Sequence, residues 1–107
     1  DSNYTKQDAA ILNITRAFEQ ALGLANHIIK TDKLGISADS GQSFDLLFQA
    51  GIIPQELADR LKKMVGFRNI AIHEYQNINL SILVSVIQKD LDDLLRFTEA
   101  VAKHQFE

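Results

Sequence analysis

An arginine, a histidine and a tyrosine lie within one short stretch of the chain, at Arg68, His73 and Tyr75. Arginine carries a planar, positively charged group with several donors that fits a phosphate. Histidine can give or take a proton near neutral pH. Tyrosine adds a phenol that forms hydrogen bonds, or acts as a nucleophile when a neighbouring group activates it. These three side chain types together suggest chemistry on a phosphate group.

A basic strip leads into this stretch. Between Arg60 and Ile72 the sequence has four basic residues and no acidic one: Arg60, Lys62, Lys63 and Arg68. The formal net charge of the whole chain is -3, which argues against a protein that holds RNA by bulk charge. Taken alone, the strip fits a solvated helix face equally well. Because the strip runs into the arginine and the histidine, it favours phosphate binding. Lys62 and Lys63 are expected to bind or orient the substrate.

Several other kinds of site are excluded or disfavoured. The chain has no cysteine, so disulfides and thiolate metal sites are ruled out. His73-Glu74 does not begin a zinc protease motif, because the position of the second histidine is Asn77. The three histidines are scattered, and the sequence has no glycine-rich phosphate loop. We expect Asp90, Asp92 and Asp93 to form an exposed helix face rather than a pair of catalytic carboxylates.

Long amphipathic segments surround the strip. The first predicted helix runs from Thr5, its expected cap, to Lys30, with Asn26 and His27 as a polar pair on its surface. Turn-forming residues follow, and then a short helix from Phe44 to Ala50, capped by Ser40 or Ser43. Apolar residues of the first helix recur at spacings of three and four, which predicts one buried stripe: Ile11, Ile14, Phe18, Ala21, Ala25 and Ile28.

The third helix begins with Pro54 in its first turn and runs into the Arg–His stretch. It directs Lys62 and Lys63 outward. Arg68 and His73 are five positions apart, which is about 140° around an ideal helix. For both side chains to reach one cleft, we expect the helix to end or bend between residues 72 and 75. Its inward positions are Leu57, Leu61, Met64 and Val65.

The last helix is predicted from Leu80 to His104, with Asn77 or Asn79 as its cap. Val84 and Leu95 widen its apolar stripe, which indicates contact with more than one neighbour. No stretch reads as a strand, so we predict an all-α protein, an antiparallel four-helix bundle that forms a single domain over residues 1–107. The core face of this helix is expected at Leu83, Ile87, Leu91, Leu94 and Val101.

The sequence has no recognisable secretion signal and no apolar run long enough to span a bilayer. Together with the lack of cysteine, this favours the reducing cytoplasm over a secreted or membrane location.

The pattern Arg68-x4-His73-x-Tyr75 resembles the signature of the HEPN ribonuclease superfamily, and its ending is similar to that of the HepT-like toxin branch. The segments 61–67 and 21–29 resemble that branch too, and the similarity extends from about Ala9 to about Val101. In that family another helix precedes the position at which this sequence starts. The resemblance therefore implies a HEPN-like bundle with a further N-terminal helix.

The resemblance implies a homodimeric endoribonuclease toxin that needs no metal or other cofactor and cleaves cellular RNA, either tRNA or mRNA, in the cleft between protomers. It makes Arg68 and His73 catalytic, and it gives Asn69 the role of orienting the site or contacting RNA. Its partner would be an antitoxin of the minimal nucleotidyltransferase (MntA-like) type. That antitoxin would attach AMP to Tyr75, and a bulky, charged adduct there would block the cleft and repel RNA.

Two other functions fit the sequence. The chain could be a non-catalytic regulatory subunit, or a nucleotide-binding partner, of a minimal nucleotidyltransferase. It could also be an interaction bundle in which Arg68 and His73 only satisfy carbonyls at a helix end, with Tyr75 packing the turn. The endoribonuclease is favoured, because RNA brings its own nucleophile, the 2′-hydroxyl, and an arginine with a histidine supplies the remaining needs.

Overall fold

The computed structural model describes residues 6–74 and 80–106; the side chains of residues 6–8, 67–74, 80 and 83 lie outside this description. The described residues form helices and no strand, which confirms the predicted all-α class. There are four of them in the described part: α1 (Lys6–Thr31), α2 (Ser40–Gln49), α3 (Gln55–Glu74) and α4 (Leu80–Phe106). Caps predicted at Thr5, Asn77 and Asn79 fall outside it. None of the described helices is long and apolar enough to cross a membrane.

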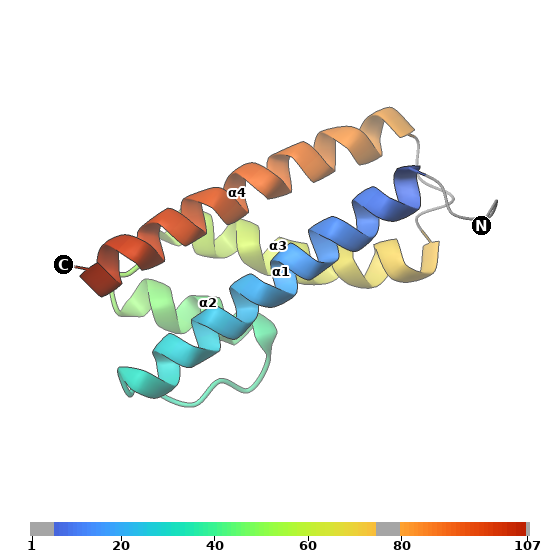
Figure 1. The fold of residues 1–107 in the computed structure, drawn as a ribbon. Helices are drawn as coiled ribbons and strands as arrows, with labels where there is room; N and C mark the ends of the chain where they lie inside the picture. The colour runs from blue at the N-terminus through green and yellow to red at the C-terminus, as the bar shows by residue number, and fades with distance from the viewer. Residues whose placement is uncertain (1–5, 75–79, 107) are drawn as a thin grey trace.

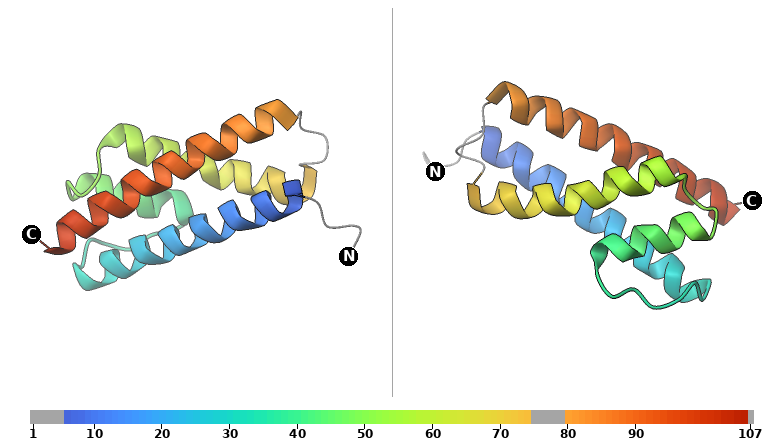
Figure 2. Two further views of the ribbon diagram at one scale, coloured as in Figure 1. Left: turned by 45° about the horizontal axis from the view of Figure 1, so that its top comes forward. Right: turned by 180° about the vertical axis from the view of Figure 1, so that it is seen from behind.

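Three long helices form the body of the molecule (Figure 1). Helices α1 and α4 run side by side in the same direction, and α3 runs antiparallel to both. The connector after α1 leads back along the bundle, so that the short α2 also points the same way as α1 and packs against α3 (Figure 2). As a result, the C-terminal end of α3 and the N-terminal ends of α1 and α4 lie at one end of the bundle.

The core is built around three phenylalanines from three different helices. Phe44 of α2 lies between Phe18 of α1 and Phe97 of α4, with ring centroids 6.0 and 5.8 Å apart. The second pair meets edge to face, an arrangement that aromatic quadrupoles favour. From α3, Leu57 and Leu61 complete this cluster. The six apolar positions predicted for the first helix are all buried, as the helical spacing required.

The start of α2 differs from the prediction. The helix begins at Ser40 rather than Phe44, and its cap is Asp39, whose Oδ1 accepts the backbone N–H of Gln42 at 2.8 Å. Ser43 is buried and donates instead to Asn26 Oδ1 of α1, at 2.7 Å. The serine caps were therefore wrong. An aspartate is at least as good a cap as a serine, and burial makes the Ser43 hydroxyl seek a partner on another helix.

Two further predictions need correction. Pro54 lies just before α3 rather than in its first turn, and its carbonyl accepts the backbone N–H of Ala58. Leu91 was expected on the core face of the last helix, yet 45% of its surface is exposed. Leu94 and Val101 are buried as predicted. Leu91 lies on the side of α4 that borders α1, where no described helix covers it.

Candidate functional site

The predicted catalytic residues lie at the end of α3. Arg68, Asn69 and His73 belong to its last two turns, and the helix ends at Glu74, inside the interval predicted for an end or a bend. Tyr75 lies outside the described residues. Because the helix continues through His73, positions 68 and 73 remain about 140° apart around its axis. The end of α3 therefore brings these positions to one end of the bundle but does not place them on one face of the helix.

The basic strip is less positive than its sequence suggests. The Lys62 Nζ donates a hydrogen bond to Asp45 Oδ1 of α2 at 3.2 Å and lies 3.0 Å from Oδ2. The hydrogen bond raises the pKa of Lys62 above its usual value. Lys63 is exposed and has no carboxylate partner within the described residues. Both lysines were predicted to bind or orient the substrate. Of the two, only Lys63 has a charge that no carboxylate of the described residues shares.

Arg60 also forms an ion pair, and its partner, Asp93, was wrongly predicted to be exposed. Its Nε lies 2.8 and 2.9 Å from the two carboxylate oxygens of Asp93, which is only 4% exposed. Asp93 was expected on an exposed face with Asp90 and Asp92, and only Asp92 is exposed. The sequence did hold a signal for this. Asp93 precedes Phe97 by four positions, which places the carboxylate beside the core stripe of its helix.

Asp90 lies one turn before Asp93 and is half-buried. Burial, with the charge of Asp93 as a second cause, raises the pKa of Asp90 to about 6. A carboxyl with such a pKa takes up a proton in mildly acidic solution, where an ordinary aspartate remains charged. The two acids near the α3–α4 contact thus differ: Asp93 pairs with an arginine, whereas Asp90 has a raised pKa.

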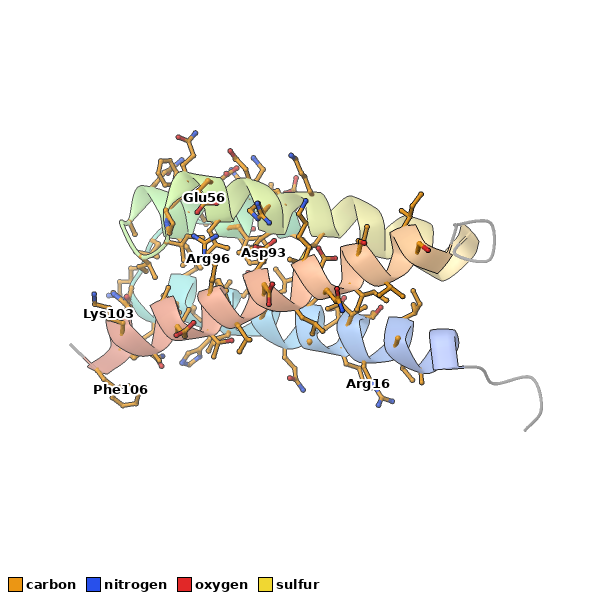
Figure 3. All side chains as sticks on the ribbon, turned by 90° about the horizontal axis from the view of Figure 1, so that it is seen from above. Arg16, Glu56, Asp93, Arg96, Lys103 and Phe106 are labelled. Carbon is orange, nitrogen blue, oxygen red and sulfur yellow. The ribbon has the colours of Figure 1, made fainter. Side chains whose placement is uncertain are left out.

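A second bridge between the same helices joins Arg96 of α4 to Glu56 of α3, and its hydrogen bond lowers the pKa of Glu56. Figure 3 shows Arg96, Glu56 and Asp93 gathered between α3 and α4. These contacts hold α3 in register with α4. The first half of the helix that carries Arg68 and His73 is thereby held against the middle of α4.

The other two histidines lie elsewhere. His27, on α1, approaches the Thr31 hydroxyl at 3.5 Å, and His104, near the end of α4, lies 2.7 Å from Asp32 Oδ2. The second contact joins α4 to the end of α1. Within residues 6–74 and 80–106, no group of three or more histidine, cysteine or acidic residues is arranged to hold a metal ion.

The protein is an all-α bundle, and the pattern Arg68-x4-His73-x-Tyr75 begins in the last turns of its third helix. This is the fold and the motif of a HEPN-type protein. The family model described as ribonuclease HepT-like matches residues 1–101. The chain therefore belongs to the ribonuclease HepT-like family.

Two relatives illustrate the match. The chain is 48% identical over 99 residues to an mRNA nuclease HepT of Shewanella oneidensis, covering 92% of this chain and 74% of the relative. It is 30% identical over 89 residues to a putative RNase of Archaeoglobus fulgidus, covering 83% of this chain and 67% of the relative.

Solved structures of similar chains share this fold. A crystal structure of a toxin–antitoxin with AMP-PNP contains a chain that is 46% identical, with a TM-score of 0.82, over 94% of this chain and 76% of that one. A tri-AMPylated Shewanella oneidensis HEPN toxin in complex with an MNT antitoxin is also 46% identical. Its TM-score is 0.84 and its coverage is the same.

Proposed function

We propose that this protein is a metal-independent endoribonuclease, the toxin of a toxin–antitoxin pair, that cleaves cellular RNA through Arg68 and His73. The observation that carries the proposal is the motif Arg68-x4-His73-x-Tyr75 at the end of α3, in a chain of the HepT-like family. The 48% identity to an mRNA nuclease supports RNA as the substrate. Lys63 and, to a smaller extent, Lys62 assist by attracting the RNA backbone.

The chemistry needs a base, an acid and a positive charge, and a histidine and an arginine are residues of the right types. A histidine removes the proton of the 2′-hydroxyl, and the 2′-oxygen forms a bond to the adjacent phosphorus. The bond from phosphorus to the 5′-oxygen breaks, and that oxygen takes a proton from an acid. The products are a 2′,3′-cyclic phosphate and a free 5′-hydroxyl. Arg68 binds the non-bridging oxygens, where charge grows in the transition state, and Asn69 orients the site or contacts RNA.

One chain supplies a single copy of His73, whereas the reaction uses a base and an acid. Two copies related by a two-fold axis would supply two of each catalytic residue, so one histidine serves as base and the other as acid. The helical course of α3 supports this arrangement, because it keeps positions 68 and 73 on different sides of one helix. We therefore propose a homodimer with a shared site.

The antitoxin would be a minimal nucleotidyltransferase that controls the site at Tyr75. The phenol of Tyr75 gives its proton to a base of the antitoxin or to water, and its oxygen attacks the α-phosphorus of ATP. The bond from that phosphorus to pyrophosphate breaks, and an AMP group remains on the tyrosine. Tyr75 is two positions after His73 in the sequence. The adduct would therefore place a bulky anion where the RNA phosphate must bind. The AMPylated state of the similar HEPN toxin supports modification in this family.

The first test is cleavage of total tRNA and of a model mRNA by purified protein in EDTA, with mass spectrometry establishing that Tyr75 carries no AMP. Wild type, Arg68→Ala, His73→Ala and the control His27→Ala would run side by side. We expect wild type and the control to cleave and the two motif variants to be inactive. Cleavage by His73→Ala at the wild-type rate, or none by unmodified wild type, would contradict the proposal and favour a non-catalytic regulatory subunit.

A further inference from the structure

Helices α3 and α4 meet along a row of facing charged residues. The first pair of the row joins Glu56 to Arg96, and the second joins Arg60 to Asp93. Figure 3 shows Glu56, Arg96 and Asp93 gathered between the two helices. Because the helices are antiparallel, each step toward the end of α3 is matched by a step toward the start of α4. The two ion pairs therefore establish which positions of the two helices face each other.

The same row has a third pair of positions, one turn nearer to the motif. On α3, Lys63 follows Arg60 by three positions, and on α4, Lys89 precedes Asp93 by four. Residues at spacings of three and four lie on the same side of a helix. Both lysines are exposed, whereas Met64, next to Lys63, is buried. Lys63 and Lys89 thus lie at the outer edge of the α3–α4 contact, at matching levels.

The third pair lacks the acid that each of the first two pairs contains. Neither Lys63 nor Lys89 makes an ion pair with any of the described residues. Asp90, adjacent to Lys89, is half-buried, and the lysine is close enough to lower its pKa slightly against the larger effect of burial. Two cations at facing positions repel each other, and an anion that lies between them removes the repulsion.

Positive charge is concentrated between this pair and the motif. The chain as a whole has a net charge of -3. Residues 60–72 of α3 and 80–89 of α4 nevertheless contain no acid, and they contain five basic residues: Arg60, Lys62, Lys63, Arg68 and Lys89. The next acid along α3 is Glu74, at the end of the helix. An anionic strand that approaches the motif along the α3–α4 edge therefore meets cations from both helices.

We propose that Lys63 and Lys89 together bind backbone phosphates of single-stranded RNA and guide the strand along the α3–α4 edge to the motif. This inference rests on the proposed function, because it extends the substrate site from Lys63 to a second helix. Five positions separate Lys63 from Arg68, a rise of about 7.5 Å along α3, so that one strand can reach both. Since lysines contact phosphates rather than bases, the pair adds affinity without sequence preference.

Binding of an RNA that cannot be cleaved tests the pair directly. The probe is a single-stranded RNA oligonucleotide with 2′-O-methyl groups, which block the internal nucleophile, and fluorescence anisotropy measures its Kd. We expect Lys89→Gln to raise the Kd about threefold to tenfold, because a phosphate contact is lost. Lys89→Arg keeps the charge, and its Kd should stay near that of wild type.

The matched control is Lys30→Gln, which changes the net charge of the chain by the same amount. Lys30 is an exposed lysine in the last turn of α1, at the other end of the bundle. We expect its Kd to stay near that of wild type. Equal Kd values for Lys89→Gln and Lys30→Gln, or a wild type that does not bind the probe, would overturn the proposal.

The salt dependence of the Kd distinguishes a phosphate contact from an indirect effect on the fold. Each neutralised phosphate of a single strand contributes about 0.7 to the slope of log K against log salt concentration. We expect Lys63→Gln and Lys89→Gln each to lower that slope by about 0.7, and the double variant to lower it by about 1.4. A weaker Kd in Lys89→Gln with an unchanged slope would overturn direct binding of phosphate by this lysine.

Cleavage assays on the same variants separate this inference from the proposed function. Lys89→Gln should raise KM about as much as Kd and leave kcat within about twofold, because the lysine binds the strand away from the reacting phosphate. If Lys89→Gln weakens probe binding but wild type cuts no RNA, the lysine pair stands and the nuclease is rejected. If wild type cuts RNA and Lys89→Gln has unchanged Kd and KM, the pair is rejected and the nuclease stands. In that second case, an acidic protein segment would be the natural partner of the two lysines.

Discussion

Lys62 and Lys63 are adjacent in sequence, but they offer different charges to a phosphate. Lys62 shares its charge with Asp45, whereas Lys63 has no carboxylate partner within the described residues. We expect Lys63→Ala to weaken RNA binding about threefold to tenfold and to lower the salt dependence, because one phosphate contact is lost. Lys62→Ala should have the smaller effect. Filter binding at several salt concentrations measures both, and a larger loss in Lys62→Ala would contradict this assignment.

Asp90 has a pKa of about 6 in the folded protein, above its ordinary value of 3.8. Folding therefore favours its protonated form. The stability that this preference contributes is fully present below pH 3.8 and is lost as pH rises through about 6. At pH 7 the charged carboxylate consequently destabilises the fold.

Replacing Asp90 by asparagine removes that charge. We expect Asp90→Asn to stabilise the protein at pH 7 by about 1 kcal/mol, less than the full shift would give because water screens a half-buried group. The gain should disappear near pH 4. Thermal unfolding at both pH values measures it, with Asp92→Asn, an exposed neighbour, as control. A variant less stable than wild type at pH 7 would show that the Asp90 carboxylate makes a favourable contact.

At the scale of elements, the Arg60–Asp93 bridge joins α3 to α4, and its two ends differ in burial. Arg60→Ala leaves the buried Asp93 without a counter-charge, so we expect a loss of about 3 kcal/mol in the free energy of unfolding. Asp93→Ala leaves an arginine whose side chain is 38% exposed, and its loss should be smaller. Urea unfolding measures the loss in free energy of unfolding for each variant, provided that the m-values stay unchanged.

The comparison of the two variants provides the check. A loss in Asp93→Ala as large as that in Arg60→Ala would mean that missing packing, rather than an uncompensated buried charge, causes the effect.

Phe44 links α2 to the two long helices on either side of it. Phe44→Ala removes the ring that contacts both Phe18 and Phe97, and it should cost about 3–5 kcal/mol. This is a large part of the stability of an ordinary domain. Phe106→Ala is the matched control, since Phe106 is 87% exposed, and its effect should stay within about 0.5 kcal/mol. Similar melting temperatures for the two variants would contradict the central role of Phe44.

Helical periodicity was enough to predict the elements but not their polar contacts. The stripe from Ile11 to Ile28 was predicted fully, because burial follows directly from spacing. Asp93 was misplaced, because its charge was given more weight than its position beside Phe97. The cap at Asp39 was missed because serine, an equally good cap, occurs nearby. Partners such as Arg60 and Asp93 lie 33 positions apart, and only the packing of α3 against α4 brings them together.

The candidate site shows the same limit. The motif indicated which residues to consider, since arginine, histidine and tyrosine types are visible in the sequence. It could not reveal that Lys62 is paired with Asp45, because that contact depends on how α2 packs on α3. It also could not reveal that Leu91 and Leu95 are exposed, because their exposure follows from the arrangement of α1 and α4.

At the scale of the whole molecule, a shared site makes activity depend on pairs of chains. If each dimer needs His73 from both copies, a mixed dimer with one His73→Ala chain lacks either its base or its acid. With equal amounts of the two chains and random pairing, about one quarter of the dimers keep both histidines. We therefore expect about one quarter of the activity of an all-wild-type sample at the same total concentration.

The measurement is the initial rate of RNA cleavage after subunit exchange, over a series of mixing ratios at constant total protein. A shared site predicts a rate that follows the square of the wild-type fraction, because both members of a pair must be intact. Independent sites predict a rate that follows the fraction itself, and half the activity at equal amounts would contradict the shared site. Mixing wild type with His27→Ala in place of His73→Ala provides the control, since that variant keeps both motif residues and its mixtures should keep full activity.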